Sequence, residues 1–307
     1  MEFKTTSYHR NLIRDTERVA VFNEAIKDYA LKFNLTNSNT SNFSNSNSNS
    51  NKFNPQDTLE SNLVAFDLGC GSGILSYLAK DYFDKIIAID INHKIVPLTK
   101  ENLAGFDNIE VYCDDVIGFD FKDKADLIIC EMLDTALIDE EEVPVLNYAK
   151  NFLKENGVII PQSIINSVEP IYMQNHYIQY EDVDSNPIYD VLGDSVIYSE
   201  FNFLEDIDED FKCQFEFNTF YNSSKSNFNS KDNDLNLNDN DLIKVNGIKI
   251  TSFTKLNDNV IVGPTPMLNP CLLVPIDEVE INCQDSLKIE LSYTMGGGIE
   301  TIKTKIL

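Results

Sequence analysis

Three glycines, Gly69, Gly71 and Gly73, alternate with other residues directly after an apolar run that contains Asp67. The apolar run is typical of a buried parallel strand, and a helical apolar pattern resumes after the third glycine. Glycines let a backbone approach a ligand closely, and a helix N-terminus points N–H groups at it. These residues, with Cys70 between them, are therefore candidates for ligand binding. The alternative is an ordinary turn between a strand and a helix.

A second apolar run, residues 85–89, ends in Asp90. This acid follows the first run by about 20 residues, the spacing at which a carboxylate binds a ribose hydroxyl. We include the next residue, Ile91, in the candidate site. The glycine pattern is G-x-G-x-G and differs from the G-x-G-x-x-G of dinucleotide-binding turns. Together the turn, Asp67 and Asp90 favour a site for a nucleoside.

Two further acids, Asp114 and Asp115, follow the apolar residues 111–113. In an open α/β sheet the ligand lies at the carboxyl ends of the strands, so these acids belong to the candidate site. Asp114 could accept a hydrogen bond from an adenine amino group, with Val116 packed against the ring. Alternatively, both acids cap the turn that follows the strand, as aspartates often do.

Glu131 directly follows four apolar residues and opens an acid-rich loop, residues 131–142, that contains no basic residue. A carboxylate in this position is partly removed from water and needs a partner. A cationic or hydrogen-bond-donating substrate between Glu131 and Glu140 would supply one. The alternative for residues 140–142 is that these acids stabilise the N-terminus of the next helix.

Strand-like and helix-like segments alternate between residues 60 and 165, which predicts a doubly wound parallel sheet. From about residue 164 the pattern changes to short alternating apolar runs, which predict an antiparallel β-sandwich or barrel. We expect strands near 63–67, 85–90, 109–112, 126–131 and 157–160, helices near 74–82, 93–104 and 142–154, and β-rich runs at 195–203, 213–220, 242–254, 271–274, 286–294 and 299–305.

Four segments follow from these patterns. Residues 1–33 carry helical apolar spacing from residue 8 and are expected to be N-terminal helices that close over the bound ligand. Residues 34–57 are an Asn/Ser-rich stretch expected to be a disordered linker. Residues 58–163 form the α/β domain. Residues 164–307 form the β domain, with a second polar tract at 223–241 expected to be disordered.

The formal net charge of −26 over 307 residues makes nucleic-acid binding unfavourable and would attract a basic substrate. An acidic surface that only confers solubility is the alternative. The six cysteines and three histidines show no metal-ligand spacing, so no metal site is expected. We find no apolar stretch long enough for a membrane span and no signal peptide, and we expect a cytoplasmic protein.

The glycine motif with Asp67 resembles that of class I S-adenosylmethionine-dependent methyltransferases. Over most of its length the chain resembles the protein arginine methyltransferases. His9, Asp15 and Arg18 match the spacing of that family's H-x5-D-x2-R helix. The resemblance implies S-adenosylmethionine as cofactor, with Arg18 at its carboxylate and His9 nearby. It also implies that Glu131 and Glu140 are the catalytic glutamates that hold the substrate, which would be a protein or peptide.

The chain departs from this family where the substrate would be bound. Residues 132–135 are Met-Leu-Asp-Thr instead of Trp-Met-Gly-Tyr, and the YFxxY and Thr-His-Trp motifs are missing. The helical arm that builds the family's dimer has no counterpart after Gly193, so we expect a monomer or a dimer through another surface. A small molecule or RNA as acceptor, or a catalytically silent interaction module, are the alternatives.

Overall fold

The computed structural model describes residues 3–43, 62–181, 185, 187–220, 242–282 and 285–307. The chain forms two compact units. The first unit comprises Met1–Glu131 and Ala149–Ile160, and the second comprises Met132–Tyr148 and Pro161–Leu307. Within the described ranges, no helix combines the length and the apolar character that crossing a membrane requires.

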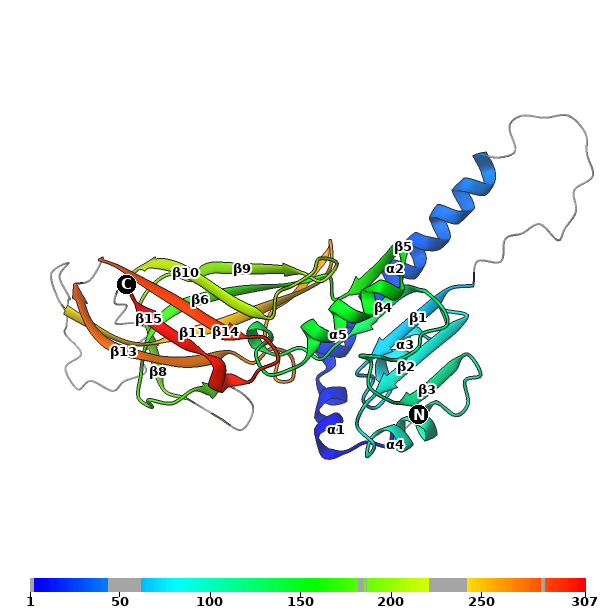
Figure 1. The fold of residues 1–307 in the computed structure, drawn as a ribbon, viewed down its shortest axis with the longest axis horizontal. Coiled ribbons are helices and arrows are strands. Elements are labelled where there is room, and N and C mark those ends of the chain that lie inside the picture. Colours follow the sequence, from blue (N-terminus) through cyan, green and yellow to red (C-terminus); the bar gives the residue numbers. More distant parts are fainter. Residues whose placement is uncertain (1–2, 44–61, 182–184, 186, 221–241, 283–284) are drawn as a thin grey trace, which may run out of the picture. The chain divides into compact units, whose positions relative to one another are not determined.

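The first unit is built on a five-stranded parallel sheet with the strand order β3-β2-β1-β4-β5 (Figure 1). Every residue of β1 and β4 is buried, as expected for central strands covered on both faces. The order reverses between β1 and β4, which creates a topological switch point at their carboxyl ends. The predicted doubly wound sheet is confirmed. The strands are β1 (Val64–Leu68), β2 (Lys85–Asp90), β3 (Ile109–Cys113), β4 (Ala125–Cys130) and β5 (Leu153–Ile160).

Among the described residues, the helices of this unit are α1 (Ser7–Arg14), α2 (Thr16–Phe43), α3 (Ile74–Ala79) and α4 (Val96–Leu103), whereas α5 (Glu142–Ala149) belongs to the second unit except for its last residue. Helix α2 buries Phe22, Ala25 and Ile26 on one face and packs beside α3. The hydroxyl of Tyr29 donates to the carbonyl of Asp126 over 2.8 Å. This apolar stripe and its hydrogen bond dock α2 on the first unit.

Helix α2 continues to Phe43, through the start of the Asn/Ser-rich stretch that was expected to be a linker. Asn and Ser are poor helix formers, but extending a docked helix costs far less free energy than nucleating a new one. Residues 44–57 of the expected linker and the polar tract 223–241 lie outside the described residues.

The second unit consists of antiparallel sheets, as predicted. Seven strands form one sheet, in which β7-β13-β11-β6-β8 are successive neighbours, β12 pairs with β11 and β9 pairs with β6. The other sheet has the order β10-β14-β15 (Figure 1). The strands are β6 (Ser163–Met173), β7 (Gln179–Tyr180), β8 (Tyr189–Val191), β9 (Val196–Asn202), β10 (Asp210–Asn218), β11 (Leu242–Asn257), β12 (Val260–Val262), β13 (Leu272–Asn282), β14 (Ser286–Thr294) and β15 (Lys303–Ile306).

The second unit differs from the sequence-based expectation in its bounds and in several strands, since the short strands β7, β8 and β12 were not predicted. Strand β6 was not among the predicted runs, because most of its residues are buried on both faces and it lacks the alternation that marks a half-exposed strand. Residues 132–148, expected in the α/β domain, belong to the second unit. Glu131 therefore belongs to the first unit, whereas the acid-rich loop that follows it belongs to the second.

Candidate functional site

The glycine turn joins β1 to α3 in a conformation that needs glycine. Gly69, Gly71 and Gly73 have φ values of +68°, +49° and +82°, where other L-residues are strained. A Cβ atom on Gly71 would lie 2.9 Å from Cδ2 of His9, and one on Gly73 would lie 2.7 Å from a methyl carbon of Leu103. The turn is thus packed on both sides by neighbouring segments of the first unit.

Asp90, at the end of β2, is hydrogen-bonded to this turn. Its Oδ2 accepts the N–H of Gly71 and its Oδ1 accepts the N–H of Asn92, each over 2.8 Å. Asp90 is half-buried, and each carboxylate oxygen can accept a second hydrogen bond. The next side chain, Ile91, is 69% exposed. A polar acceptor and an exposed apolar group therefore lie together at the carboxyl end of β2.

Asp67 and Cys70 are buried beneath this surface. Asp67 accepts the backbone N–H of Ser76 over 2.9 Å and also the Ser76 hydroxyl, so its side chain ties β1 to α3. Burial raises the pKa of Asp67 to about 6 and raises the pKa of the Cys70 thiol well above its usual value. Within the chain, Asp67 has the role of positioning the turn.

Arg18 and Glu131 form a buried ion pair between α2 and the end of β4. Their side chains are only 4% and 7% exposed. Burial lowers the pKa of Arg18 to about 10, so the guanidinium stays charged at neutral pH. A carboxylate removed from water, such as Glu131, needs a partner, and Arg18 of the same unit is that partner.

Arg18 also carries an unused donor. Its Nη1 donates to the carbonyl of Leu12 over 3.4 Å, and its backbone N–H donates to Asp15 over 3.1 Å. The Nε is buried and has no hydrogen-bond partner in the described part of the chain. Leaving a buried donor of a charged group unpaired costs free energy, so this atom suits a bound acceptor such as a ligand carboxylate.

His9 approaches the same turn from α1. Its Nδ1 shares a hydrogen bond of 2.6 Å with the hydroxyl of Thr6, the residue that caps α1. Burial lowers the pKa of His9, an effect that nearby Asp90 opposes, so the ring is neutral at neutral pH. His9, Gly71 and Asp90 are therefore brought together, as expected for one binding site.

The acids after β3 form turn hydrogen bonds. Asp114 accepts the N–H of Asp115 over 2.9 Å, and Asp115 accepts the N–H of Ile117 over 2.8 Å. These bonds are those expected if the two acids cap the turn after the strand. Both side chains are also exposed to solvent. The backbone N–H of Asp114 bonds to the carbonyl of Asp90, and Val116 is buried. The segment thus lies beside the end of β2.

Glu140 belongs to the second unit, in a strained and tightly bonded loop. Asp134 accepts the N–H groups of Ile138, Asp139 and Glu140 over 3.0, 2.9 and 3.2 Å. Just before them, residues 136 and 137 have φ values of +61° and +62°, which is uncommon for residues other than glycine. Burial raises the pKa values of Asp134, to about 7, and of Glu140. Strain of this kind persists only where surrounding contacts fix the backbone.

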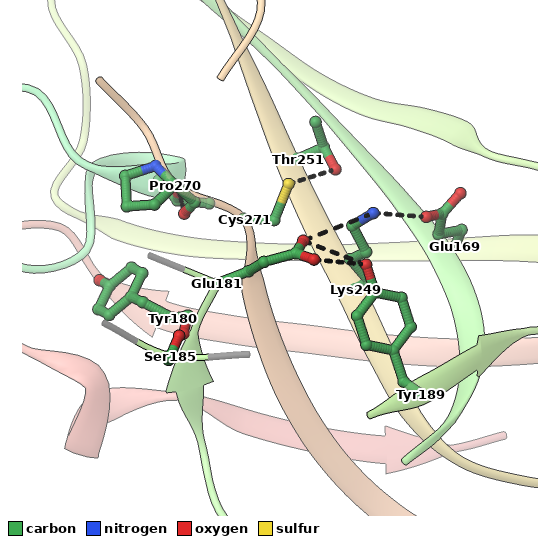
Figure 2. Close-up of polar contacts among 10 residues, drawn as sticks. Glu169, Tyr180, Glu181, Ser185, Tyr189, Lys249, Thr251, Pro270 and Cys271 are labelled. Atoms are coloured by element: carbon green, nitrogen blue, oxygen red, sulfur yellow. Dashed lines mark hydrogen bonds and ion pairs between the residues drawn. The ribbon is translucent and has the colours of Figure 1, made fainter. Parts of the chain in front are cut away.

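Tyr180, which no sequence pattern marks, holds this loop in place. Its hydroxyl donates to Asp139 over 2.5 Å. The neighbouring Glu181 is anchored in turn, because its N–H donates to the carbonyl of Cys271 and its carboxylate accepts the Tyr189 hydroxyl over 3.0 Å. The Nζ of Lys249 lies 3.9 Å from Oε2 of Glu181 (Figure 2).

Lys249 itself is held by a cross-strand partner. It stands opposite Glu169 in the register of β11 and β6, and the ion pair measures 3.3 Å. Figure 2 shows this cluster of alternating charge on one face of the sheet. It fixes β7 and hence the position of the Tyr180 hydroxyl. In the sequence, only Asp134 pointed to this tightly bonded loop, because aspartates often accept hydrogen bonds from backbone N–H groups that follow them.

The structure offers no sign of a metal centre in the ranges it describes, where no three His, Cys, Asp or Glu side chains are grouped to hold an ion. The first unit instead gathers an acidic acceptor, a glycine turn and an unpaired guanidinium donor. This set suits an organic ligand that carries hydroxyl groups and a carboxylate.

Comparisons with known proteins agree with this chemistry. Residues 59–192 match a protein family described as a methyltransferase domain. The chain is 36% identical, over the full length of both proteins, to an uncharacterised protein of Methanothermobacter thermautotrophicus. It is 32% identical to the ribosomal protein L11 methyltransferase of Thermoanaerobacter sp., over 36% of this chain and 35% of that protein.

One solved structure has a similar fold over nearly the whole chain. It is the Trypanosoma brucei PRMT1 enzyme–prozyme heterotetrameric complex with AdoHcy, which has a TM-score of 0.67 and covers 98% of both chains. The sequences are 14% identical, so this likeness concerns the fold.

Proposed function

We propose that this chain, which belongs to the class I S-adenosylmethionine-dependent methyltransferases, methylates a protein side chain. One observation carries the assignment of the site. A buried Arg18 Nε without a partner in the described residues lies in the same unit as an Asp90 that is bonded to the glycine turn.

The residues of the first unit fit the cofactor. Asp90 would accept the ribose hydroxyls, and the exposed Ile91 would cover one face of the adenine. Arg18 would pair with the cofactor carboxylate, and His9 would close the site over Gly71. S-adenosylmethionine, when bound, supplies a methyl group already activated by its sulfonium. The protein then has to align the acceptor and exclude water.

The charge of the protein supports a cationic acceptor. The net charge of −26 would attract a basic protein segment, as the acid-rich loop around Glu140 would locally. A guanidinium stays charged at neutral pH, and a carboxylate can localise its charge away from the attacking nitrogen. We assign this role to Glu131 and Glu140. A carboxylate or water would accept the proton that leaves the methylated nitrogen.

The changed residues 132–135 favour a second candidate, a methyltransferase with a small-molecule or RNA acceptor. The similarity to the ribosomal protein L11 methyltransferase spans about a third of the chain, so it supports the cofactor assignment and leaves the acceptor open.

The acceptor is identified with S-adenosylmethionine labelled in its methyl group. The purified protein is incubated with this cofactor and a cell extract, and parallel samples of the extract are first treated with protease, treated with nuclease or filtered to keep only small molecules. We expect label in the protein fraction that protease pretreatment abolishes and nuclease leaves unchanged. Label lost with nuclease, or retained in the small-molecule filtrate, would overturn the protein acceptor. No label in any fraction, despite cofactor binding, would indicate a silent module.

A further inference from the structure

The side-chain amide of Asn102, on α4, bonds to two segments of the first unit that are far apart in sequence. Its Oδ1 accepts the N–H of Lys4 over 2.8 Å, and its Nδ2 donates to the carbonyl of Lys4 over 2.9 Å. The same Nδ2 donates to the carbonyl of Ser72 over 3.1 Å. Asn102 is 3% exposed, so water competes little for these bonds. Both of its donor hydrogens and one acceptor oxygen are used.

The two segments that Asn102 joins carry the two halves of the cofactor site. Lys4 precedes α1 and α2, which bring His9 and Arg18 to the site. Ser72 stands between Gly71 and Gly73 of the glycine turn. One buried amide therefore fixes the start of the N-terminal segment to the backbone that would contact the cofactor.

Neighbouring contacts support the same docking but contribute less. Lys4 forms an ion pair with Glu101 in which both side chains are more than half exposed, and such pairs add little free energy. The ring of Phe3 meets the ring of Tyr77 edge to face, with 5.5 Å between centroids. The hydroxyl of Thr99, also on α4, donates to the carbonyl of Gly71. Helix α4 thus holds the turn at two carbonyls and the N-terminal segment at one residue.

We propose that Asn102 is a positioning residue that docks the N-terminal segment on the glycine turn and thereby sets the affinity for the S-adenosyl ligand. This inference rests on the proposed cofactor site. When the segment is undocked, Arg18 and His9 are no longer held at the site. The apparent dissociation constant therefore rises in inverse proportion to the fraction of molecules in the docked state.

The test compares Asn102→Ala with the matched control Asn108→Ala. Nδ2 of Asn108 donates to the carbonyls of Lys80 and Phe83, each over 2.8 Å, and within the described residues neither bond involves the N-terminal segment. Calorimetry measures binding of S-adenosylhomocysteine, and hydrogen exchange follows residues 3–14. For Asn102→Ala we expect about tenfold weaker binding and faster exchange of these residues. For Asn108→Ala we expect neither effect.

A second pair of variants leaves the folded core untouched. Lys4→Pro removes the N–H that Asn102 accepts, whereas Lys4→Ala keeps it and removes only the exposed ion pair. Lys4→Pro should weaken binding as Asn102→Ala does, and Lys4→Ala should bind like the unmodified protein. Equal affinity in all four variants, with the unmodified protein binding normally, would overturn the role of Asn102. Failure of the unmodified protein to bind would instead contradict the cofactor site.

Discussion

At the scale of single residues, Asp90 is oriented by two hydrogen bonds, because each of its carboxylate oxygens accepts a backbone N–H group. Each oxygen also has a lone pair left for a ligand. Asp90→Ala should weaken S-adenosylmethionine binding roughly 10- to 100-fold, since about 1–3 kcal/mol is lost when the ribose hydroxyls and the Gly71 N–H lose their acceptor. Isothermal calorimetry checks this, with Asp81→Ala, an exposed acid two residues after α3, as control. Unchanged affinity would remove Asp90 from the site, and preferential binding of NAD would contradict the cofactor assignment.

Arg18 and Glu131 make a prediction about stability. Arg18→Met leaves the buried Glu131 carboxylate without its partner and should lower the free energy of unfolding by about 3–5 kcal/mol. The double variant Arg18→Met/Glu131→Met should be more stable than either single variant, because it removes both buried charges together. Urea unfolding of the four proteins measures this coupling. Strictly additive losses would show that the two side chains do not form an ion pair in solution.

At the scale of elements, the N-terminal segment is held to the rest of its unit by the hydrogen bonds between Asn102 and Lys4 and by the packing of α2 beside α3. If Arg18 binds the cofactor carboxylate, helix residues 8–22 should become more ordered when the ligand binds. Hydrogen exchange over these residues should slow in the presence of S-adenosylhomocysteine, while exchange in β6 of the second unit stays the same. Exchange that is equally fast with and without ligand would favour a structural role for Arg18, confined to its pair with Glu131.

The elements also show how far the sequence can be interpreted. Strands β1, β2 and β4 were predictable because each is a short apolar run that ends at an acid or a glycine. The contact between His9 and Gly71 was not predictable from spacing, since it depends on how α1 docks. The same is true of Arg18 and Glu131, whose pairing depends on the packing of α2 beside the end of β4. Patterns locate strand ends, whereas long-range partners follow from tertiary packing.

At the scale of the whole molecule, net charge and topology both bear on assembly. Residues 192–195 join β8 directly to β9, so the chain has no helical arm at this position. A net charge of −26 also makes two copies repel one another. We therefore predict a monomer, or a dimer that dissociates at low micromolar concentration. Sedimentation velocity over a concentration series tests this at physiological salt, and a tight dimer would mean that another surface has replaced the arm.

The most direct test of the account is methyl transfer by the unmodified protein and by Glu131→Gln, each at saturating labelled S-adenosylmethionine and with the same protein acceptor fraction. Glutamine keeps an acceptor for Arg18 but removes the negative charge. We predict that turnover falls at least ~100-fold while cofactor affinity stays within a small factor of the original. The control Glu155→Gln, an exposed acid in β5, should transfer label normally. Near-normal turnover by Glu131→Gln with intact cofactor binding would contradict catalysis by this carboxylate and point to a neutral acceptor held by other residues.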